Sequence, residues 1–410
     1  MTALQLFGWI VAAALLQLGA AIALALWRKG GVPAAAARAE GVAASAAPAS
    51  GEGAWAGWRE FRVVRREYED AACTQCSFYL EPVDGAPLPP YPPGRFLTFS
   101  VELPGAEGPR TLTRCYSLSD APDARAYRVT IKRVPAPPGR PELPPGQVSG
   151  HFHERVQVGD VLRLRAPAGH FVLDAEASLP VVLVAGGIGI TPMLAMLRCS
   201  LAEAPQRPVH LFYGVRHGAE LAFGPVLAAL ALAHPAFALH RVFSQPAAGD
   251  EPGRDYEHAG FVNVELIQRL LPHGRHRFFV CGPPPMMQAL VPALGAWGVP
   301  AEDLRYEAFG PASMAAPAPA AATASASLEV RFSASGRTLV WDGRDASLLD
   351  FAERHGVAVE SGCRSGGCGA CQTRVASGSV RYAHAPDHDV AAGHCLLCVG
   401  KPASALVLEA

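Results

Sequence analysis

The pattern of apolar and polar positions changes its character several times along the chain. The first stretch, Leu6–Trp27, is apolar and uncharged, with Gln17 as its one strongly polar side chain. As a helix rising about 1.5 Å per residue it would extend roughly 33 Å, enough to cross a hydrocarbon core of about 30 Å. Arg28 and Lys29 follow directly, and the positive-inside rule then keeps the remaining chain in the cytoplasm. We therefore expect residues 1–29 to be a single-pass transmembrane anchor in the inner (cytoplasmic) membrane.

A cleaved signal peptide is the alternative for this stretch. It lacks a basic region before the apolar run, and that run is longer than signal peptides usually have. Residues 30–54 are mostly Ala, Gly, Ser and Pro and cannot bury enough surface to order themselves. The same holds for residues 311–327. We expect disordered linkers at 30–57 and 311–327.

From Trp58 the pattern turns to short alternating stretches separated by Pro and Gly. This spacing predicts an antiparallel barrel or sandwich over residues 58–176, with strands at Phe61–Arg65, Phe96–Glu102, Tyr127–Val134 and Val161–Ala166.

Continuous apolar runs follow, as expected for strands buried on both faces of a parallel sheet. They are Val181–Ala185, Val209–Tyr213, Ala238–Phe243 and Arg277–Val280. We therefore expect residues 177–310 to form a Rossmann-like α/β domain.

The last segment, residues 328–410, returns to alternating strands. These are expected at Leu328–Phe332 and Thr338–Trp341, with a short helix at Leu348–His355 and a strand pair near Gln372–Tyr382. The predicted fold class is therefore α/β plus β, with one transmembrane helix.

The composition excludes some classes of function. With 410 residues and a formal charge of −1 there is no global attraction to nucleic acid. The ten cysteines do not form the framework of a short secreted chain, and their strongest motif needs reduced thiolates. Cys73 and Cys76 stand in a C-x2-C without a second pair, so ordinary thiols are favoured over zinc or a redox disulfide.

Three cysteines near the carboxyl terminus carry the chemistry. Cys363, Cys368 and Cys371 have the C-x4-C-x2-C spacing of a plant-type [2Fe–2S] cluster, and Cys398 is the candidate fourth ligand. The alternatives are unligated thiols or a zinc site, although zinc sites usually use two short pairs. The loop contains four glycines that we expect at positive φ: Gly362, Gly366, Gly367 and Gly369.

A Gly-rich turn follows the first buried strand of the α/β domain and precedes an apolar helix. Strand, turn and helix amino terminus together predict a dinucleotide phosphate site. Its expected contacts are Gly186, Gly187, Gly189, Thr191 and Pro192. Thr191 can donate to a phosphate or cap the helix.

The segment Arg114-Cys115-Tyr116-Ser117-Leu118-Ser119 lies in the barrel region. It resembles the R-x-Y-S-[hydrophobic]-[ST] motif of the ferredoxin–NADP reductase superfamily. The resemblance implies that Arg114 contacts the flavin phosphate, Tyr116 stacks on the ring and Ser117 bonds it. The alternative is a buried strand Tyr beside a surface Arg.

Further motifs extend the resemblance. Gly146-Gln147-Val148-Ser149 is similar to the family's second phosphate-binding turn, although Ser149 could simply be a helix N-cap. This turn and the Ala166–Gly169 segment are most similar to the flavohaemoglobin reductase portion, which implies FAD, and less to the FMN-using phthalate dioxygenase reductases. Arg95 departs from the family, where Gln is usual. The expected flavin contacts also include Leu118, Ser119, Lys132, Gly146 and Val148.

Cys281-Gly282-Pro283-Pro284-Pro285-Met286 resembles the family's C-G-P-x-x-M motif beside the nicotinamide. This implies that Cys281, Gly282 and Pro283 bind the cofactor and that Cys281 positions it; a buried structural Cys is the alternative. Phe309 is the expected aromatic cover of the flavin, and Glu307 a weaker polarising group. With Tyr116 and Ser117, the residues Cys281 and Phe309 complete the expected catalytic set.

Residues 328–410 resemble a β-grasp plant-type ferredoxin. Cys395 could compete as a ligand, but the family's C-x3-P spacing to Pro402 selects Cys398. Arg216 and Arg241 are the available partners for a 2′-phosphate, yet neither lies in a clear signature, and the resemblance favours NADH over NADPH.

These modules predict a membrane-anchored NAD(P)H-dependent reductase. Electrons would pass from NAD(P)H to FAD to [2Fe–2S], whose potential is roughly −400 mV, and then to a partner metalloprotein such as an oxygenase or haem protein. The alternatives are the reductase component of a nitric oxide dioxygenase-type or quinone-reducing system, and a membrane-tethered redox sensor.

Overall fold

The computed structural model describes residues 55, 57–105, 108–136, 144–174, 178–309, 328–362, 364, 366–382, 386, 388 and 390–410. The predicted anchor, the linker at 311–327 and Cys363 lie outside these residues. Within the described part of the chain, no helix is both long and apolar enough to cross a membrane. We therefore correct the expectation of a single-pass membrane location with cytoplasmic catalytic domains, because the structure does not support it.

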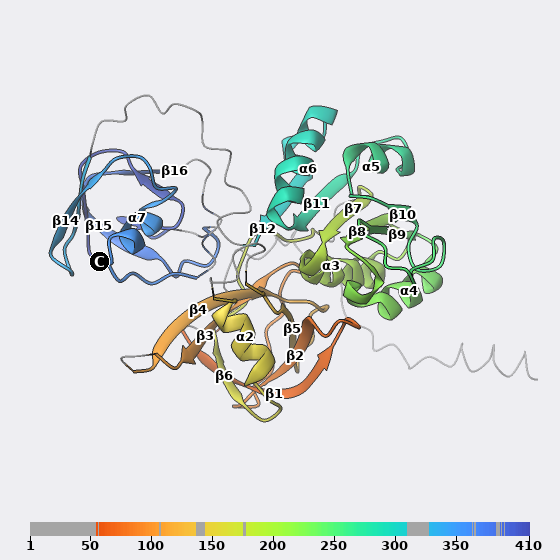
Figure 1. Ribbon diagram of the computed structural model, residues 1–410, viewed down its shortest axis with the longest axis horizontal. Helices are drawn as coiled ribbons and strands as arrows, with labels where there is room; N and C mark the ends of the chain where they lie inside the picture. Colours follow the sequence, from red (N-terminus) through yellow and green to blue (C-terminus); the bar gives the residue numbers. More distant parts are fainter. Residues whose placement is uncertain are drawn as a thin grey trace, which may run out of the picture. The chain divides into compact units, whose positions relative to one another are not determined.

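The first sheet is antiparallel and, among the described residues, has six strands in the order β4-β3-β6-β1-β2-β5 (Figure 1). The strands are β1 (Arg59–Tyr68), β2 (Gln75–Pro82), β3 (Phe96–Leu103), β4 (Arg110–Ser117), β5 (Tyr127–Lys132) and β6 (Val161–Leu164). In β1 the buried Phe61 and Val63 alternate with the exposed Glu60 and Arg62, as a strand with one core-facing side requires.

The two outer strands of this sheet approach each other beyond the end of β4. A bridge joins Leu118 to Val129 of β5, and the N–H of Ser119 donates to the carbonyl of Arg128 at 2.9 Å. Helix α2 (Gln147–Glu154) packs against β3 and β5. Its Phe152 is fully buried and completes the core of the sheet. The expectation of an antiparallel barrel-like sheet is confirmed.

The second sheet is parallel, with six strands in the described residues ordered β10-β9-β8-β7-β11-β12. They are β7 (Val181–Gly186), β8 (Val209–Val215), β9 (Phe237–Phe243), β10 (His258–Ala259), β11 (Arg277–Gly282) and β12 (Leu304–Ala308). Every residue of β7 is buried, which explains its unbroken apolar sequence.

Helices cover both faces of the parallel sheet (Figure 1). One hydrophobic core joins the sheet to α3 (Ile190–Glu203) and α4 (Gly224–Ala233), and a second joins it to α5 (Val264–Leu270) and α6 (Pro284–Trp297). Helix α5 begins where the Asn263 side chain accepts from the N–H of Leu266, and α6 ends at Gly298 with φ of +100°. Short 3-10 helices are η1 (Gly187–Gly189), η2 (Gly218–Glu220) and η3 (Ala301–Asp303).

The carboxyl-terminal segment has a mixed sheet with five strands among the described residues, in the order β14-β13-β19-β15-β17. The elements are β13 (Leu328–Phe332), β14 (Arg337–Trp341), α7 (Leu348–Arg354), β15 (Gln372–Ser377), β16 (Val380–Tyr382), β17 (His394–Leu396), β18 (Gly400–Pro402) and β19 (Leu406–Leu408). The strands predicted near Gln372–Tyr382 are β15 and β16. They do not pair with each other there, because β16 pairs with β18, and β15 with β17 and β19.

The core of this segment brings the helix together with some of the cysteines. Leu348, Leu349 and Phe351 of α7 pack in the same buried cluster as Cys371 and Cys398. Helix α7 starts at Ser347, whose Oγ accepts from the N–H of Asp350 at 3.1 Å. The described helix ends at Arg354, one residue before the predicted boundary. The domain limits proposed from the sequence stay predictions.

Candidate functional site: two junctions for electron transfer

The two nucleotide motifs meet at the point where the order of the parallel strands reverses. Strand β7 pairs with β8 on one side and with β11 on the other, and Ala185 lies opposite Cys281. In open α/β sheets, ligands bind beyond the carboxyl ends of the strands at such a switch point. The turn after β7 and the Cys-Gly-Pro turn after β11 therefore share one edge.

Glycines allow these two turns to pack against each other. A Cβ atom at Gly189 would lie 2.1 Å from the Cys281 carbonyl oxygen. A Cβ at Gly186 would lie 2.6 Å from both Met286 Sδ and Pro283 Cδ. Residues 186 and 189 must therefore both be Gly so that the two turns can pack against each other. The sequence motif alone did not reveal this reason. Gly187 has φ of +52° and faces open space, with Lys132 Nζ 3.9 Å from its Cβ position.

Helix α3 begins at this turn with Gly189 as its N-cap and no capping side chain. The hydroxyl of Thr191 donates to the Ile188 carbonyl at 3.0 Å, and Pro192 occupies the first turn, where its missing N–H costs nothing. Of the two roles considered for Thr191, N-cap of α3 is excluded. The uncapped amides of the first turn remain for an anion such as the dinucleotide pyrophosphate.

The carboxyl end of β4 reaches the same region. Ser117 is buried, and its hydroxyl donates to the Glu307 carboxylate of β12 at 3.4 Å. Glu307 lies opposite Cys281 in the pairing of β11 with β12. Burial, and then the charge of Glu307, raise the pKa of the Cys281 thiol well above its usual value. The raised pKa favours the neutral thiol, which suits the predicted positioning role.

Tyr116 is fixed by two aromatic neighbours. Its ring makes edge-to-face contacts with Phe99 and Phe152, each with centroids 5.5 Å apart. Burial raises the pKa of its hydroxyl, so the phenol stays protonated. Arg114, two residues earlier, donates to the Thr113 carbonyl at 2.7 Å. A half-buried aromatic ring beside an arginine at a strand end fits a stacked flavin and its phosphate.

The remaining residues predicted to bind flavin divide into two groups. Leu118 and Ser119 are fully buried in the fold. The Ser119 hydroxyl shares a hydrogen bond of 2.8 Å with Thr130, and Arg128 donates to the Ser119 carbonyl. These contacts stabilise the barrel and give Ser119 a structural role, whereas Lys132 lies beside the dinucleotide turn.

The second predicted phosphate-binding turn is the start of α2. Gly146 is the N-cap and no side chain caps the helix, while Val148 is buried. Ser149 lies inside the helix; its hydroxyl donates to the Gly146 carbonyl and accepts from the N–H of Val134. The alternative that Ser149 is the N-cap is therefore wrong. The uncapped amides at this helix start fit a flavin phosphate.

Three of the four predicted cluster ligands are described, and all three are buried in the third segment: Cys368, Cys371 and Cys398. The N–H of Cys398 donates to Cys371 Sγ at 3.4 Å. Backbone N–H groups directed at cysteine sulfur are what an iron–sulfur cluster requires for charge compensation. Among the described residues no three such side chains are placed to hold a metal ion, so the structural support for the cluster is the pair Cys371 and Cys398, which lie together.

The glycines of the cluster loop have different roles. Gly366 and Gly369 take the expected positive φ of +82° and +69°. The same expectation is wrong for Gly362 and Gly367, which have no positive φ. Gly362 is needed for another reason, because a Cβ there would lie 2.6 Å from Cys368 Sγ. Arg364, which was not singled out, has φ of +59°.

Cys395 lies close to the predicted cluster ligands in the sequence but differs from them in its surroundings. It is nearly completely buried, and burial, followed by interaction with Cys371, raises the pKa of its thiol to about 12. It lies opposite Thr373 in β17, whereas Cys398 follows the strand and turns its N–H to Cys371. This geometry favours Cys398 over Cys395 as the ligand.

The structure also adds residues that the motifs did not indicate. Phe96 of β3 packs in one buried cluster with Cys368 and Ala370 of the cluster loop, with Cys115 at its margin. Cys115 lies between the two predicted flavin contacts Arg114 and Tyr116 in the sequence. Phe309, predicted to cover the flavin, is 39% exposed just after β12. Contacts such as that of Phe96 leave no local sequence signal.

Comparisons with known proteins agree with this arrangement. A family described as "Oxidoreductase NAD-binding domain" matches residues 183–291, and one described as "2Fe-2S iron-sulfur cluster binding domain" matches residues 331–403. A flavohemoprotein of Chromobacterium violaceum is 41% identical over 263 residues, covering 64% of this chain and 63% of the relative. One of Rhizobium meliloti is 38% identical over 259 residues, covering 63% and 62%. The chain thus spans less than two thirds of the length of these relatives.

Two solved structures extend the comparison. The flavohem-like FAD/NAD-binding domain of nitric oxide dioxygenase from Vibrio cholerae is 33% identical, with a TM-score of 0.53, covering 62% of this chain and 99% of that one. Phthalate dioxygenase reductase, described as a modular structure for electron transfer from pyridine nucleotides to [2Fe-2S], is 27% identical with a TM-score of 0.53, covering 86% and 98%. The cofactors are therefore FAD, NADH (or NADPH) and a [2Fe–2S] cluster. The chain is an NAD(P)H oxidoreductase that belongs to the flavohaemoprotein-type FAD/NAD-binding reductase family and carries a carboxyl-terminal [2Fe–2S] ferredoxin domain.

Proposed function

We propose that this reductase takes electron pairs from NADH at its flavin and delivers single electrons through its cluster to a partner metalloprotein, with an oxygenase as the first candidate. The observation that carries the proposal is the joint presence of two junctions in one chain. Ser117, Glu307 and Cys281 meet where the barrel and the parallel sheet contact each other, and Cys371 and Cys398 lie together in the third segment.

The flavin supplies the conversion from a hydride donor to a one-electron carrier. Each NADH is oxidised to NAD⁺ with release of a proton, and two electrons leave one at a time by way of the cluster. The chain's own residues position the partners. Tyr116 is held by Phe99 and Phe152, and the Ser117 hydroxyl is held by Glu307. The buried, neutral thiol of Cys281 adds no charge at this junction.

The resemblance to phthalate dioxygenase reductase supports an oxygenase partner, since that structure is described as passing electrons from pyridine nucleotides to [2Fe-2S]. The contact of Phe96 with Cys368 and Ala370 supports a short route between the barrel and the cluster loop. The proposed ligand set is Cys363, Cys368, Cys371 and Cys398, of which Cys363 lies outside the described residues.

The test compares two neighbouring cysteines in the full chain, purified without air. We expect Cys398→Ser to lower NADH-dependent cytochrome c reduction at least about twentyfold, because the exit is lost, and to leave ferricyanide reduction at the flavin within about twofold. The matched control is Cys395→Ser, which should retain both activities and the EPR signal of the reduced cluster. If Cys398→Ser keeps full cytochrome c reduction, the cluster is not the exit.

The flavohaemoprotein relatives favour a haem protein as a second candidate acceptor. Turnover with a purified haem partner and with a purified oxygenase separates the two. Steady reduction of either would also dismiss a sensor role, because a sensor needs only one slow reduction. The acceptor reduced faster at equal concentration is the favoured partner.

A further inference from the structure

One face of the paired strands β2 and β5 is polar and yet buried. Alternate residues of the two strands belong to the barrel core: Cys76, Phe78, Leu80, Tyr127, Val129 and Ile131. The residues between them face the other way, and four of these are also buried: Gln75, Ser77, Arg128 and Thr130. Burial of polar groups is costly unless they are hydrogen-bonded. Another part of the chain must therefore cover this face and satisfy it.

The cover is the β8–α4 segment, residues 216–223 of the dinucleotide domain. The side-chain amide of Gln75 donates to the Glu220 carbonyl at 3.0 Å. In the turn between β1 and β2, the N–H of Ala72 donates to the Ala219 carbonyl at 2.9 Å. Strand β2 and the turn before it therefore hold the β8–α4 segment against the barrel.

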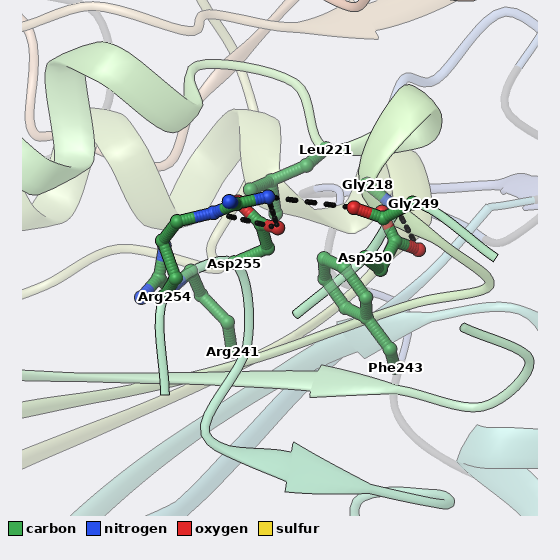
Figure 2. Close-up of a pocket in the computed structure, with 8 residues that line it drawn as sticks. All are labelled: Gly218, Leu221, Arg241, Phe243, Gly249, Asp250, Arg254 and Asp255. Atoms are coloured by element: carbon green, nitrogen blue, oxygen red, sulfur yellow. Dashed lines mark hydrogen bonds and ion pairs between the residues drawn. The ribbon is translucent and has the colours of Figure 1, made fainter. Parts of the chain in front are cut away.

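The same segment is also held within the dinucleotide domain. Asp250, in the loop after β9, accepts from the N–H of Gly218 at 3.1 Å (Figure 2). Gly218 and Leu221 line a pocket of about 300 Å³ at this end of the parallel sheet. Because the segment has contacts on both sides, it joins the barrel to the parallel sheet.

Phe223, the last residue of the segment, is held in an unfavourable backbone conformation. Its side chain is buried, and its φ is +59°, which is strained for a bulky side chain. Its N–H donates to the Glu69 carbonyl at 3.1 Å, and the Arg128 guanidinium lies 5.0 Å from the centre of its ring. This distance is that of a cation–π contact. The barrel thus supplies both contacts that keep Phe223 in place.

Arg128 is itself fixed by a buried hydrogen-bond network of the barrel. Its Nε donates to the Ser119 hydroxyl at 3.2 Å, and its Nη2 donates to the Ser119 carbonyl. The Ser119 hydroxyl shares a hydrogen bond of 2.8 Å with Thr130, and Thr130 shares another of 2.8 Å with Ser77. Because these side chains are buried, a lost partner leaves a polar group unsatisfied. The guanidinium is therefore pre-oriented towards Phe223.

A carboxylate extends this network to helix α3. Asp120 Oδ1 lies 2.6 Å from Arg198 Nη1 of that helix, and Asp120 Oδ2 lies 3.4 Å from Arg128 Nη2. Helix α3 starts at the Gly-rich turn. With the hydrogen bond of Ser117 to Glu307 of β12, the barrel is therefore attached to the dinucleotide domain at α3, at the β8–α4 segment and at β12.

We propose that Arg128 is a positioning residue for hydride transfer, because it sets the orientation of the dinucleotide domain on the barrel through Phe223 and Asp120. The inference deepens the proposed function and rests on it for the reaction that the orientation serves. Reacting atoms must approach to about 3–3.5 Å, and a misplacement of about 1 Å can cost a hundredfold in rate. Loss of the Arg128 contacts should therefore slow flavin reduction and leave the affinity for NADH nearly unchanged.

The test follows flavin bleaching by NADH in the full holoenzyme by stopped flow, which separates the limiting rate at saturating NADH from the dissociation constant. Arg128→Lys keeps the charge but loses the planar fork that bonds Ser119 and lies against Phe223. We expect the limiting rate to fall about tenfold and the dissociation constant to change less than about twofold.

A second variant tests the contact from its other side. Phe223→Leu keeps an apolar side chain but removes the ring, and should lower the limiting rate about threefold. Because Arg128 and Phe223 act through one contact, the double variant should be no slower than Arg128→Lys alone. Should Arg128→Lys lose its flavin, Phe223→Leu carries the test by the same two measurements.

Hydrogen exchange adds a readout that needs no turnover. In Arg128→Lys the amides of residues 216–223 should exchange faster, whereas those of β7 should keep wild-type protection. The matched control is Arg125→Lys, in the connection between β4 and β5. Arg125 pairs with Asp123 at 3.4 Å, and its side chain is 86% exposed. This control should leave the limiting rate and the exchange of residues 216–223 unchanged.

The inference is overturned if Arg128→Lys reduces its flavin at the wild-type rate, or if the double variant shows the product of the two single losses. It is also overturned if the dissociation constant rises as much as the limiting rate falls. The proposed function fails separately, because flavin reduction precedes transfer to the cluster. Full cytochrome c reduction by Cys398→Ser would reject the proposed exit and would not change the limiting rates of the Arg128 and Phe223 variants. Circular dichroism and bound-flavin absorbance confirm that the compared proteins are folded.

Discussion

Two Gly-rich loops in this chain look alike in sequence and depend on glycine for different reasons. In the turn after β7, a Cβ at Gly189 would lie 2.1 Å from a backbone oxygen, that of Cys281. In the cluster loop, Gly366 and Gly369 have left-handed backbone, and the atoms nearest to a Cβ at Gly369 belong to the His388 side chain. At Gly189 the first loop excludes a side chain by packing against backbone, whereas at Gly366 and Gly369 the second loop needs a left-handed conformation. Substitutions should therefore have unequal costs.

The largest effect is expected for Gly189→Ala. Since neither backbone can yield cheaply, the turns after β7 and β11 must separate, and we expect a loss of at least about 3 kcal/mol in the free energy of unfolding. NADH-dependent flavin reduction should fall with it. Urea unfolding followed by circular dichroism, with stopped-flow flavin bleaching, measures both.

The control for that substitution lies two residues away. Gly187 has φ of +52° but open space around its Cβ position. Gly187→Ala should therefore cost only the left-handed strain of about 1 kcal/mol. Equal losses in the two variants would show that packing against Cys281 does not distinguish this loop.

The next largest loss of stability is expected in the cluster loop. Gly369→Ala places a side chain at φ of +69° and within 2.3 Å of His388 Nε2, a contact that side-chain rotation can relieve. We expect a loss of about 1–2 kcal/mol and a reduced cluster content after reconstitution. Iron content and the visible absorbance of the cluster measure it. Gly367→Ala is the control, because its nearest contacts are an ordinary 3.5 Å and its φ is not positive. A larger loss in the control would contradict the argument.

The comparison also shows what local sequence can and cannot predict. The buried strand, Gly-rich turn and helix at Val181–Leu197 were predictable because each signal lies within a few residues. The hydrogen bond of Ser117 to Glu307 joins residues 190 positions apart, and the close approach of Gly189 to Cys281 joins the turn after β7 to strand β11. Such pairs exist only after the sheet order is fixed. The positive φ expected at Gly362 was wrong for a local reason, because the constraint there is the Cys368 sulfur six residues later in the same loop.

Low pH should lower the free energy of unfolding through the parallel sheet, which contains the first loop, rather than through the cluster loop. In the parallel sheet, His240 stacks on Phe212 and lies 3.3 Å from His210, and burial, then the charges of His210 and His258, lower its pKa to about 4. The folded state therefore favours neutral His240, so its contribution is complete above about pH 6.5 and is lost as the pH falls towards 4. Because part of the side chain reaches solvent, we expect the loss between pH 7.5 and 5 to be only about 1–2 kcal/mol.

The measurement is the free energy of unfolding in urea across that pH range. His240→Phe should flatten the dependence, because no proton is taken up on unfolding at this site. His234→Phe, at the end of α4, is the control and should leave the slope unchanged. An unchanged slope in His240→Phe would assign the acid sensitivity to other groups.

The smallest effect is expected at Arg364, the non-glycine residue of the cluster loop with φ of +59°. Its side chain forms ion pairs with Glu353 and, at 3.9 Å, with Asp350. Arg364→Gly removes left-handed strain of about 1–2 kcal/mol, but it adds unfolded-state entropy of about 0.4–1 kcal/mol and loses partly exposed ion pairs worth about 0–1 kcal/mol. The sum is within about 0.5 kcal/mol of zero. Glu353→Gln removes one ion pair alone, so a loss in Arg364→Gly that exceeds it by more than about 1 kcal/mol would mean that this position does not need left-handed backbone.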